Sequence, residues 1–140
     1  MTRTWSLCYS DDHGITGEVR LTIDDERASY DARITLPGFG YVVVADDELR
    51  APTGSLLEVR GDGLWAEFVC EVPGEHWATA LEAFGLRFED AEEARGSDRG
   101  DRIPVGLDLE WETPDVVTGE ILAGSRRWPF TGHGTLRIDQ

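Results

Sequence analysis

Residues 56–72 read LLEVRGDGLWAEFVCEV, and this stretch carries the clearest structural signal in the chain. From residue 64 onward every second side chain is apolar, which is the period of a β-strand with one buried face: Leu64, Ala66, Phe68, Cys70 and Val72. The dipeptide Asp62-Gly63 separates this run from the shorter apolar run at 56–60, and Asp-Gly in that position is a strong β-hairpin signal. The stretch therefore predicts two antiparallel strands joined by a tight turn.

The same alternation recurs on both sides of this hairpin. It is clearest in three runs, at residues 18–23, 28–36 and 103–111. Shorter apolar runs predict further strands, which lie at 41–44, 116–123, 126–130 and 134–138. Glycine, proline and aspartate mark the turns between the runs, including a predicted turn at Gly132-His133-Gly134.

Eight to ten short strands with no linker and no internal repeat indicate one all-β domain over residues 1–140. Such a chain forms either a closed barrel or a sandwich. Because most connections are as short as hairpins, we predict a single antiparallel, lipocalin-like β-barrel. A barrel of about eight strands has an interior that is filled by side chains or holds one small ligand.

Two segments are less regular. Residues 76–88 contain good helix formers such as Ala78, Ala80 and Leu81, but Gly85 would weaken a helix and the neighbouring segments are all β. We favour a strand there and keep a helix as the alternative. Residues 90–102 are rich in charge and predict a mobile acidic surface loop with one helical turn at its start.

The charge balance narrows the possible partners. The formal net charge is -15, from 28 acidic and 13 basic residues, and all the basic residues are arginine. Such a surface repels phosphate backbones and anionic lipids, so we expect no nucleic-acid or membrane partner. The absence of lysine excludes lysine Schiff-base chemistry. With no signal-peptide core in the sequence, we expect a cytoplasmic protein in which Cys8 and Cys70 are reduced thiols.

No motif of metal, cofactor or nucleophile chemistry is present in the sequence. His13, His76 and His133 lie far apart and lack metal-ligand spacing. The chain has no nucleophile elbow, and no glycine loop of the phosphate-binding kind precedes a helix. We therefore expect no metal and no cofactor.

Two polar residues on apolar faces are the candidate catalytic groups. If residues 76–88 form a strand, Glu82 shares a face with Ala80 and Phe84, and a carboxylic acid in an apolar cavity could donate a proton. If that face is the outer one, Glu82 is solvated. Tyr30 lies between Ala28 and Ala32, whose small side chains leave space for a ligand, although a packed core tyrosine is the alternative.

Aromatic side chains on the predicted inner faces are the candidate ligand contacts. Five Trp in 140 residues is a high number, and flat aromatic walls suit apolar ligands such as polyketides or terpenoids. The predicted contacts are Trp5, Phe68, Phe84, Trp111 and Trp128. Trp65 lies on the opposite face of its strand from Phe68 and is predicted to be a surface aromatic.

Residues 103–111 (IPVGLDLEW) and 132–140 (GHGTLRIDQ) resemble segments of the lipocalin-like half-barrels of the AttH and carotenoid 1,2-hydratase group. The resemblance covers about 60 residues and implies a β-barrel that accommodates apolar ligands, in a group whose members hydrate, isomerise or cyclise polyenes and polyketides. This chain has the length of one barrel rather than two. A site between halves would therefore require a homodimer, or the site would have to lie inside the single barrel.

Together these observations predict an intracellular barrel that binds an apolar small molecule and guides its cyclisation or isomerisation without a cofactor. Holding the reacting carbons close and oriented would supply most of the catalysis. Two alternatives remain open at this point. One is a non-catalytic carrier or sensor of an apolar ligand, and the other is an interaction module with a solid core.

Overall fold

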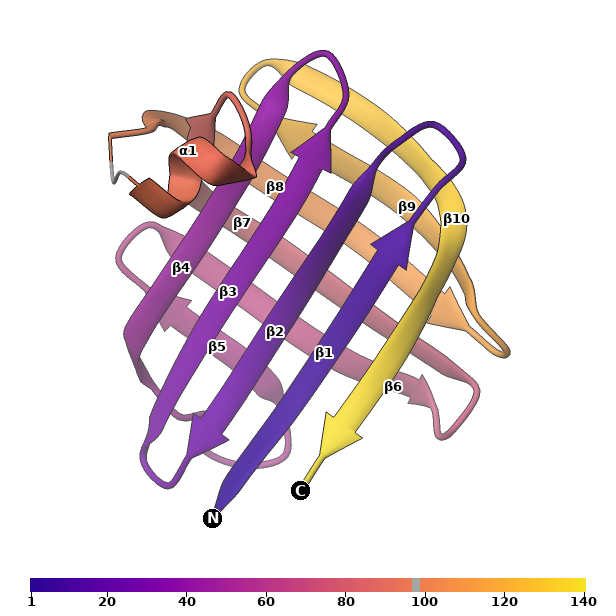
Figure 1. Cartoon of the computed structure of the whole chain (residues 1–140). Coiled ribbons are helices and arrows are strands. Elements are labelled where there is room, and N and C mark those ends of the chain that lie inside the picture. Colours follow the sequence, from indigo (N-terminus) through magenta and orange to yellow (C-terminus); the bar gives the residue numbers. More distant parts are fainter. Residues whose placement is uncertain (97–98) are drawn as a thin grey trace.

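The computed structural model describes residues 1–96 and 99–140, and within them it contains ten strands and one short helix (Figure 1). The elements are β1 (Thr2–Ser10), β2 (Thr16–Asp24), β3 (Arg27–Leu36), β4 (Gly40–Arg50), β5 (Leu57–Gly61), β6 (Leu64–Val72), β7 (His76–Phe88), α1 (Ala91–Gly96), β8 (Asp101–Glu112), β9 (Val116–Ala123) and β10 (Arg126–Asp139). Every pairing between strands is antiparallel, so the predicted all-β antiparallel class is confirmed.

Eight of the strands form a ring. The sheet runs in the order β4-β3-β2-β1-β10-β9-β8-β7-β6-β5, and an additional pairing of β4 with β7 closes it. This closure consists of three residue pairs, Tyr41–Phe88, Val42–Arg87 and Val43–Leu86. Strands β5 and β6 continue the sheet beyond the ring, because β6 pairs with the part of β7 that precedes the closure.

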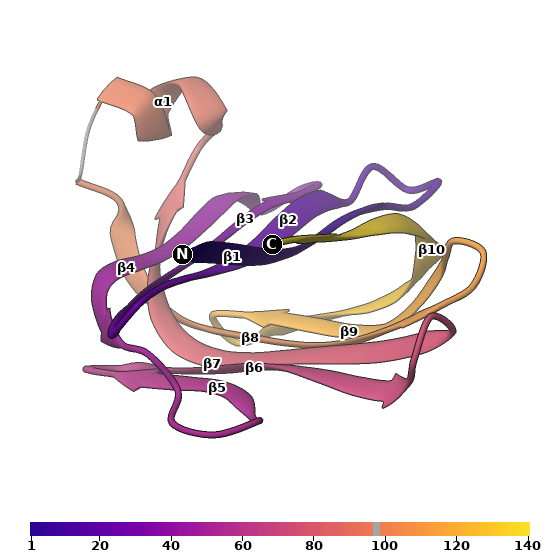
Figure 2. The ribbon, with the colours of Figure 1, turned by 90° about the horizontal axis from the view of Figure 1, so that it is seen from below.

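The sheet is folded into two layers, with β1–β4 in one and β5–β9 in the other (Figure 2). Strand β10 passes from one layer to the other, since it pairs with β9 up to His133 and with β1 from His133 onward. Glycines make this corner possible. A Cβ at Gly132 would collide with the Ser10 carbonyl oxygen, and one at Gly134 would lie 2.7 Å from the Cys8 carbonyl oxygen.

Strand β7 forms the second corner (Figure 2). It pairs with β6 up to Ala83 and with β4 from Leu86, and Gly85 lies between these two parts. A Cβ at Gly85 would lie 2.8 Å from the Val43 carbonyl oxygen and 2.8 Å from Cγ2 of Val44. Glycine therefore allows the two backbones to approach closely enough to pair. The two longest strands, β7 and β10, thus join the layers and enclose one core.

The core is a single cluster of apolar side chains between the layers. It contains the inward faces of the alternating runs that the sequence predicts, including those of residues 18–23, 28–36 and 103–111. Among the predicted ligand contacts, Trp5 and Phe68 are buried in it, and Trp111 and Trp128 pack against it while partly exposed. These four aromatics therefore face the core, as predicted.

Three boundaries differ from the sequence-based expectation. Strand β4 runs to Arg50 rather than ending near Val44, because a bulge at Ala28/Tyr30 lets its charged second half stay paired with β3. The predicted turn at residues 132–134 is instead the corner inside the continuous strand β10. Strand β8 begins at Asp101, inside the region expected to be a loop.

The two segments with a less regular sequence pattern, residues 76–88 and 90–102, contain both strand and helix. Residues 76–88 form strand β7, so the favoured interpretation is confirmed and the helical alternative is wrong. The helical turn expected near residue 90 is α1, whereas residues 97–98 of the expected loop lie outside the described residues. No helix in residues 1–96 or 99–140 combines the length and apolar character needed to cross a bilayer.

Candidate functional site

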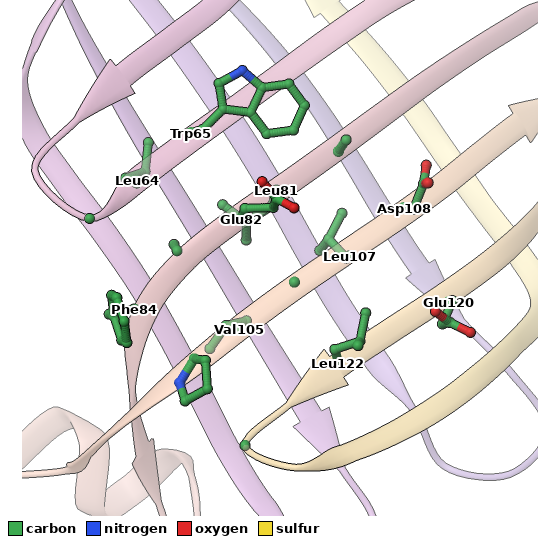
Figure 3. A pocket seen from close by; sticks show the side chains of 16 residues that line it. Leu64, Trp65, Leu81, Glu82, Phe84, Val105, Leu107, Asp108, Glu120 and Leu122 are labelled. Carbon is green, nitrogen blue, oxygen red and sulfur yellow. The ribbon is translucent and has the colours of Figure 1, made fainter.

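A hollow lies on the outer face of the second layer, over β6, β7, β8 and β9 (Figure 3). Its volume is about 750 Å³, compared with 290–570 Å³ for four other surface hollows. We call it the outer groove and define it by the side chains that face it, which are Trp65, Ala80, Glu82, Phe84, Pro104, Gly106, Asp108, Glu120 and Leu122. The groove is open to solvent rather than enclosed.

Small residues make the floor of the groove. Ala80 on β7 and Gly106 on β8 lie in neighbouring strands, between larger side chains on both sides. A Cβ at Gly106 would lie 3.4 Å from the Leu81 carbonyl oxygen, which is an ordinary contact distance. Packing therefore does not require glycine at this position. Gly106 pairs with Glu82 on β7 and with Leu122 on β9, and the lack of a side chain at Gly106 lowers the floor of the groove between these two residues.

Two aromatic side chains form the walls at one end of the groove. Trp65 lies directly across from Glu82 in the β6–β7 pairing, and its indole Nε1 donates a hydrogen bond of 3.1 Å to Glu58. Phe84 is 50 % exposed, which is unusual for so large an apolar side chain. The guanidinium carbon of Arg102 lies 4.1 Å from the centroid of the Phe84 ring, so one face of this ring already carries a cation.

Carboxylates lie among the apolar residues of the groove. Asp108 on β8 is paired directly with Glu120 on β9, and like charges in that position repel each other. Glu120 is in turn 3.4 Å from the guanidinium of Arg127. The pKa of nearby Glu67 is raised, first by partial burial and then by Glu58 and Asp108. The outer groove is therefore acidic, although its Glu120 is already paired with an arginine of the chain.

The structure separates the residues that the sequence proposed as one site. Glu82 is exposed in the outer groove, so its expected position in an apolar interior is wrong and the solvated alternative is correct. The reason is the register of β7, which turns Thr79 and Leu81 toward the core and Glu82 away from it. Phe84 shares the outer face, so it is a wall of the groove and not of the interior.

Tyr30, the other candidate catalytic residue, is inside the core and 2 % exposed. Trp111 and Trp128 lie at the margins of the core. The Trp111 Nε1 donates a hydrogen bond of 3.2 Å to the Gly134 carbonyl, and Trp128 contacts Phe39 edge to face at 5.2 Å between ring centroids. The structure thus divides the predicted site residues. Glu82 and Phe84 lie in the outer groove, whereas the others lie in or against the core, namely Trp5, Tyr30, Phe68, Trp111 and Trp128.

The groove also contains residues that sequence reasoning did not select. Trp65 was predicted to be a surface aromatic, which is confirmed, but no function was assigned to it. For Asp108 and Glu120, the sequence pattern indicates only that the side chains face solvent. Their convergence depends on the register between β8 and β9, and the alternation of each strand by itself does not contain that register.

The histidines and cysteines lie apart from the groove residues. His76 is 2.8 Å from Glu110 and His133 is 3.6 Å from Asp115, while Cys8 and Cys70 are both free thiols. Within the described part of the chain, no three His, Cys, Asp or Glu side chains are grouped so that they could hold a metal ion.

No family model matches the chain, and neither a curated protein nor a solved structure matches it at a significant level. The function must therefore be argued from the geometry of the groove.

Proposed function

We propose that this protein is an interaction module whose outer groove binds an arginine-bearing segment of a partner protein. The observation that carries the proposal is the position of Arg102, whose guanidinium lies 4.1 Å from the centroid of the Phe84 ring at the end of the groove. The chain thus places a guanidinium of its own on one aromatic wall. Trp65 and Glu82 offer a second aromatic face and a carboxylate beside it.

The chemistry of the groove favours arginine over other ligands. A guanidinium is planar, stacks on aromatic faces and is weakly hydrated, whereas a lysine ammonium is a compact and strongly hydrated charge. Glu82, Asp108 and Glu120 supply the complementary negative charge. The net charge of -15 adds a long-range attraction for a basic partner and accelerates its association.

The shape of the groove favours a polypeptide over a small molecule. Pockets for small molecules bury about 70–90 % of the surface of their ligand. The outer groove is open along its length, so it contacts a ligand from one side only. An extended peptide segment gains affinity from several such shallow contacts in succession.

Four expectations from the sequence stay predictions. They are a cyclase or isomerase activity, a carrier function for an apolar ligand, a lipocalin-like relationship and a homodimer. For the cyclase, the position of Glu82 has a direct consequence. Because this carboxylate faces solvent, a reaction inside the ring would need a different proton donor. The groove proposal requires neither an internal cavity nor a second copy of the chain.

The test is a calorimetric titration with a short synthetic peptide of alternating arginine and serine at low ionic strength. We expect the double variant Glu82→Gln/Asp108→Asn to bind it more weakly by roughly two- to thirtyfold, since each of the two exposed ion pairs contributes about 0.2–1 kcal/mol. Glu26→Gln/Asp47→Asn is the matched control, because it removes two exposed carboxylates outside the groove.

Three results would contradict the proposal. The first is an absence of measurable binding by the wild type, and the second is an equal loss of affinity in both double variants, which would indicate a general charge effect. The third is equal affinity for the peptide in which every arginine is replaced by lysine, because stacking on Trp65 and Phe84 should favour the guanidinium.

A further inference from the structure

The side chains on the outer face of β6, β7, β8 and β9 form three rows that cross these strands. The registers between the strands define the rows, because residues paired across neighbouring strands lie side by side. The first row contains Phe84 and Pro104, with Gly63 and Gly124 at its ends. The middle row contains Trp65, Glu82, Gly106 and Leu122. The third row contains Glu67, Ala80, Asp108 and Glu120.

The two outer rows give the groove an apolar side and an acidic side. Pro104 lies exposed beside Phe84 in the first row, and Leu122 in the middle row extends this apolar surface. Asp108 and Glu120 are the carboxylates of the third row within the groove. Figure 3 shows Phe84 at one margin of the groove and these two carboxylates at the other. A ligand that matches the whole groove therefore needs two kinds of group.

The chain pairs the acidic side at its β9 end but not at its centre. The guanidinium of Arg127 lies 3.4 Å from Glu120. Among the ion pairs formed between residues that the structure describes, none involves Glu67, Glu82 or Asp108. The carboxylates at the centre of the acidic side are therefore the ones available to cations of a partner.

The apolar side offers surface that a cation alone would leave in water. Arg102 covers one face of the Phe84 ring, yet 50 % of that side chain remains exposed. Leu122 is half-buried next to it, and Gly106 leaves the floor between Leu122 and Glu82 low. Removing such apolar surface from water contributes affinity in proportion to the area covered. An apolar side chain on the partner would cover it.

Resting on the proposed function, we infer that the bound segment alternates arginine with bulky apolar residues and lies across the strands along the middle row. Consecutive side chains of an extended segment point in opposite directions. One side chain then contacts Phe84 and Leu122, and the next reaches Asp108. Strands lie about 4.8 Å apart, so the distance from β6 to β9 is about 14 Å, which about four to five extended residues cover.

The test compares three peptides of about eight residues, a length that exceeds the groove. One alternates arginine and leucine, one alternates arginine and serine, and one has all its arginines before all its leucines. The three carry the same number of arginines. Calorimetric titration should show the alternating arginine–leucine peptide binding roughly tenfold more tightly than the arginine–serine peptide, because its leucines cover the apolar side. The block peptide should bind more weakly than the alternating arginine–leucine peptide.

Leu122→Thr locates the effect, and threonine is favourable in a strand. This variant should lower the ratio between the arginine–leucine and arginine–serine affinities toward one. The ratio is unaffected by a change in the fraction of folded protein, because both peptides bind the same sample. Ile138→Thr is the matched control, since Ile138 is a 40 % exposed apolar residue on β10 outside the groove. It should leave the ratio as in the wild type.

The outcomes separate this inference from the proposed function. If none of the three peptides binds, both are overturned. If the arginine–serine peptide binds and the alternating arginine–leucine peptide binds no more tightly, the inference alone is overturned. A ratio that survives Leu122→Thr would likewise overturn it, and so would equal affinity for the block peptide, which would show that the order of the residues is not read.

Discussion

Replacing Gly85 with alanine should loosen the corner that closes the ring. The new Cβ would lie 2.8 Å from the Val43 carbonyl oxygen, 2.8 Å from Val44 Cγ2 and 3.1 Å from Val105 Cγ2. The first contact involves backbone, which cannot rotate away, so β4 and β7 must separate by several tenths of an ångström. Since only three residue pairs join these strands, little other pairing is available to resist the separation.

The expected loss of stability follows from two opposing effects. Overpacking of a well-packed site costs about 1–3 kcal/mol. Replacing glycine with alanine also reduces the freedom of the unfolded chain, which returns about 0.4–1 kcal/mol. With the middle of each range, the net loss is about 1.3 kcal/mol, and for a chain of this length that corresponds to a decrease in Tm of roughly 3–7 °C.

Circular dichroism during thermal unfolding measures the effect, with Gly106→Ala as the control. Gly106 lies on the adjacent strand β8, and a Cβ there meets only ordinary contacts at 3.4–3.8 Å. We expect its Tm to equal or slightly exceed that of the wild type. A Gly85→Ala variant with the Tm of the wild type or higher would refute the tight closure between β4 and β7.

Three further predictions concern single side chains. Partial burial and, after it, neighbouring carboxylates raise the pKa of Glu67, so its ionisation opposes folding as the pH rises. Glu67→Gln should therefore stabilise the protein at pH 7 more than at pH 4 in urea unfolding, and an equal effect at both pH values would contradict this. Partial burial and a hydrogen bond to Glu18 raise the pKa of Cys8 to about 11. Iodoacetamide should therefore label Cys8 slowly at pH 8 and faster in the Glu18→Gln variant, measured by mass spectrometry in protein that also carries Cys70→Ser. An unchanged labelling rate would argue against the Glu18 contact. Phe130→Ala should lower the free energy of unfolding by about 3–5 kcal/mol in urea unfolding, because the Phe130 side chain is 1 % exposed in the core. A loss below about 1 kcal/mol would contradict this and would mean that neighbouring side chains fill the gap.

Alternation along the chain predicts the all-β class and the positions of most strands because it is a local property. The hairpin at residues 56–72 and the strand at 103–111 follow directly from the spacing of their apolar residues. The second half of β4 could not be predicted in this way. Asp46, Asp47 and Glu48 interrupt the pattern, and their strand conformation depends on pairing with β3 beyond a bulge.

The candidate site was harder to predict because it depends on which face of β7 is buried. Both faces of this strand contain apolar residues, with Ala80 and Phe84 on one and Leu81 and Ala83 on the other. Only the packing of the two layers decides between them. The corner at residues 132–134 has a similar explanation, because glycines that allow close backbone approach have the same sequence pattern as glycines in a turn.

The position of a bound arginine peptide can be measured directly by mapping amide chemical-shift changes on ¹⁵N-labelled protein. We expect changes to concentrate on the outer groove, at Trp65, Ala80, Glu82, Gly106 and Leu122, and to saturate with one affinity. The first layer should change little, with Thr35 and Ala45 as reporters. Changes centred on β1–β4, or scattered with the acidic residues over the whole surface, would contradict a specific site in the groove.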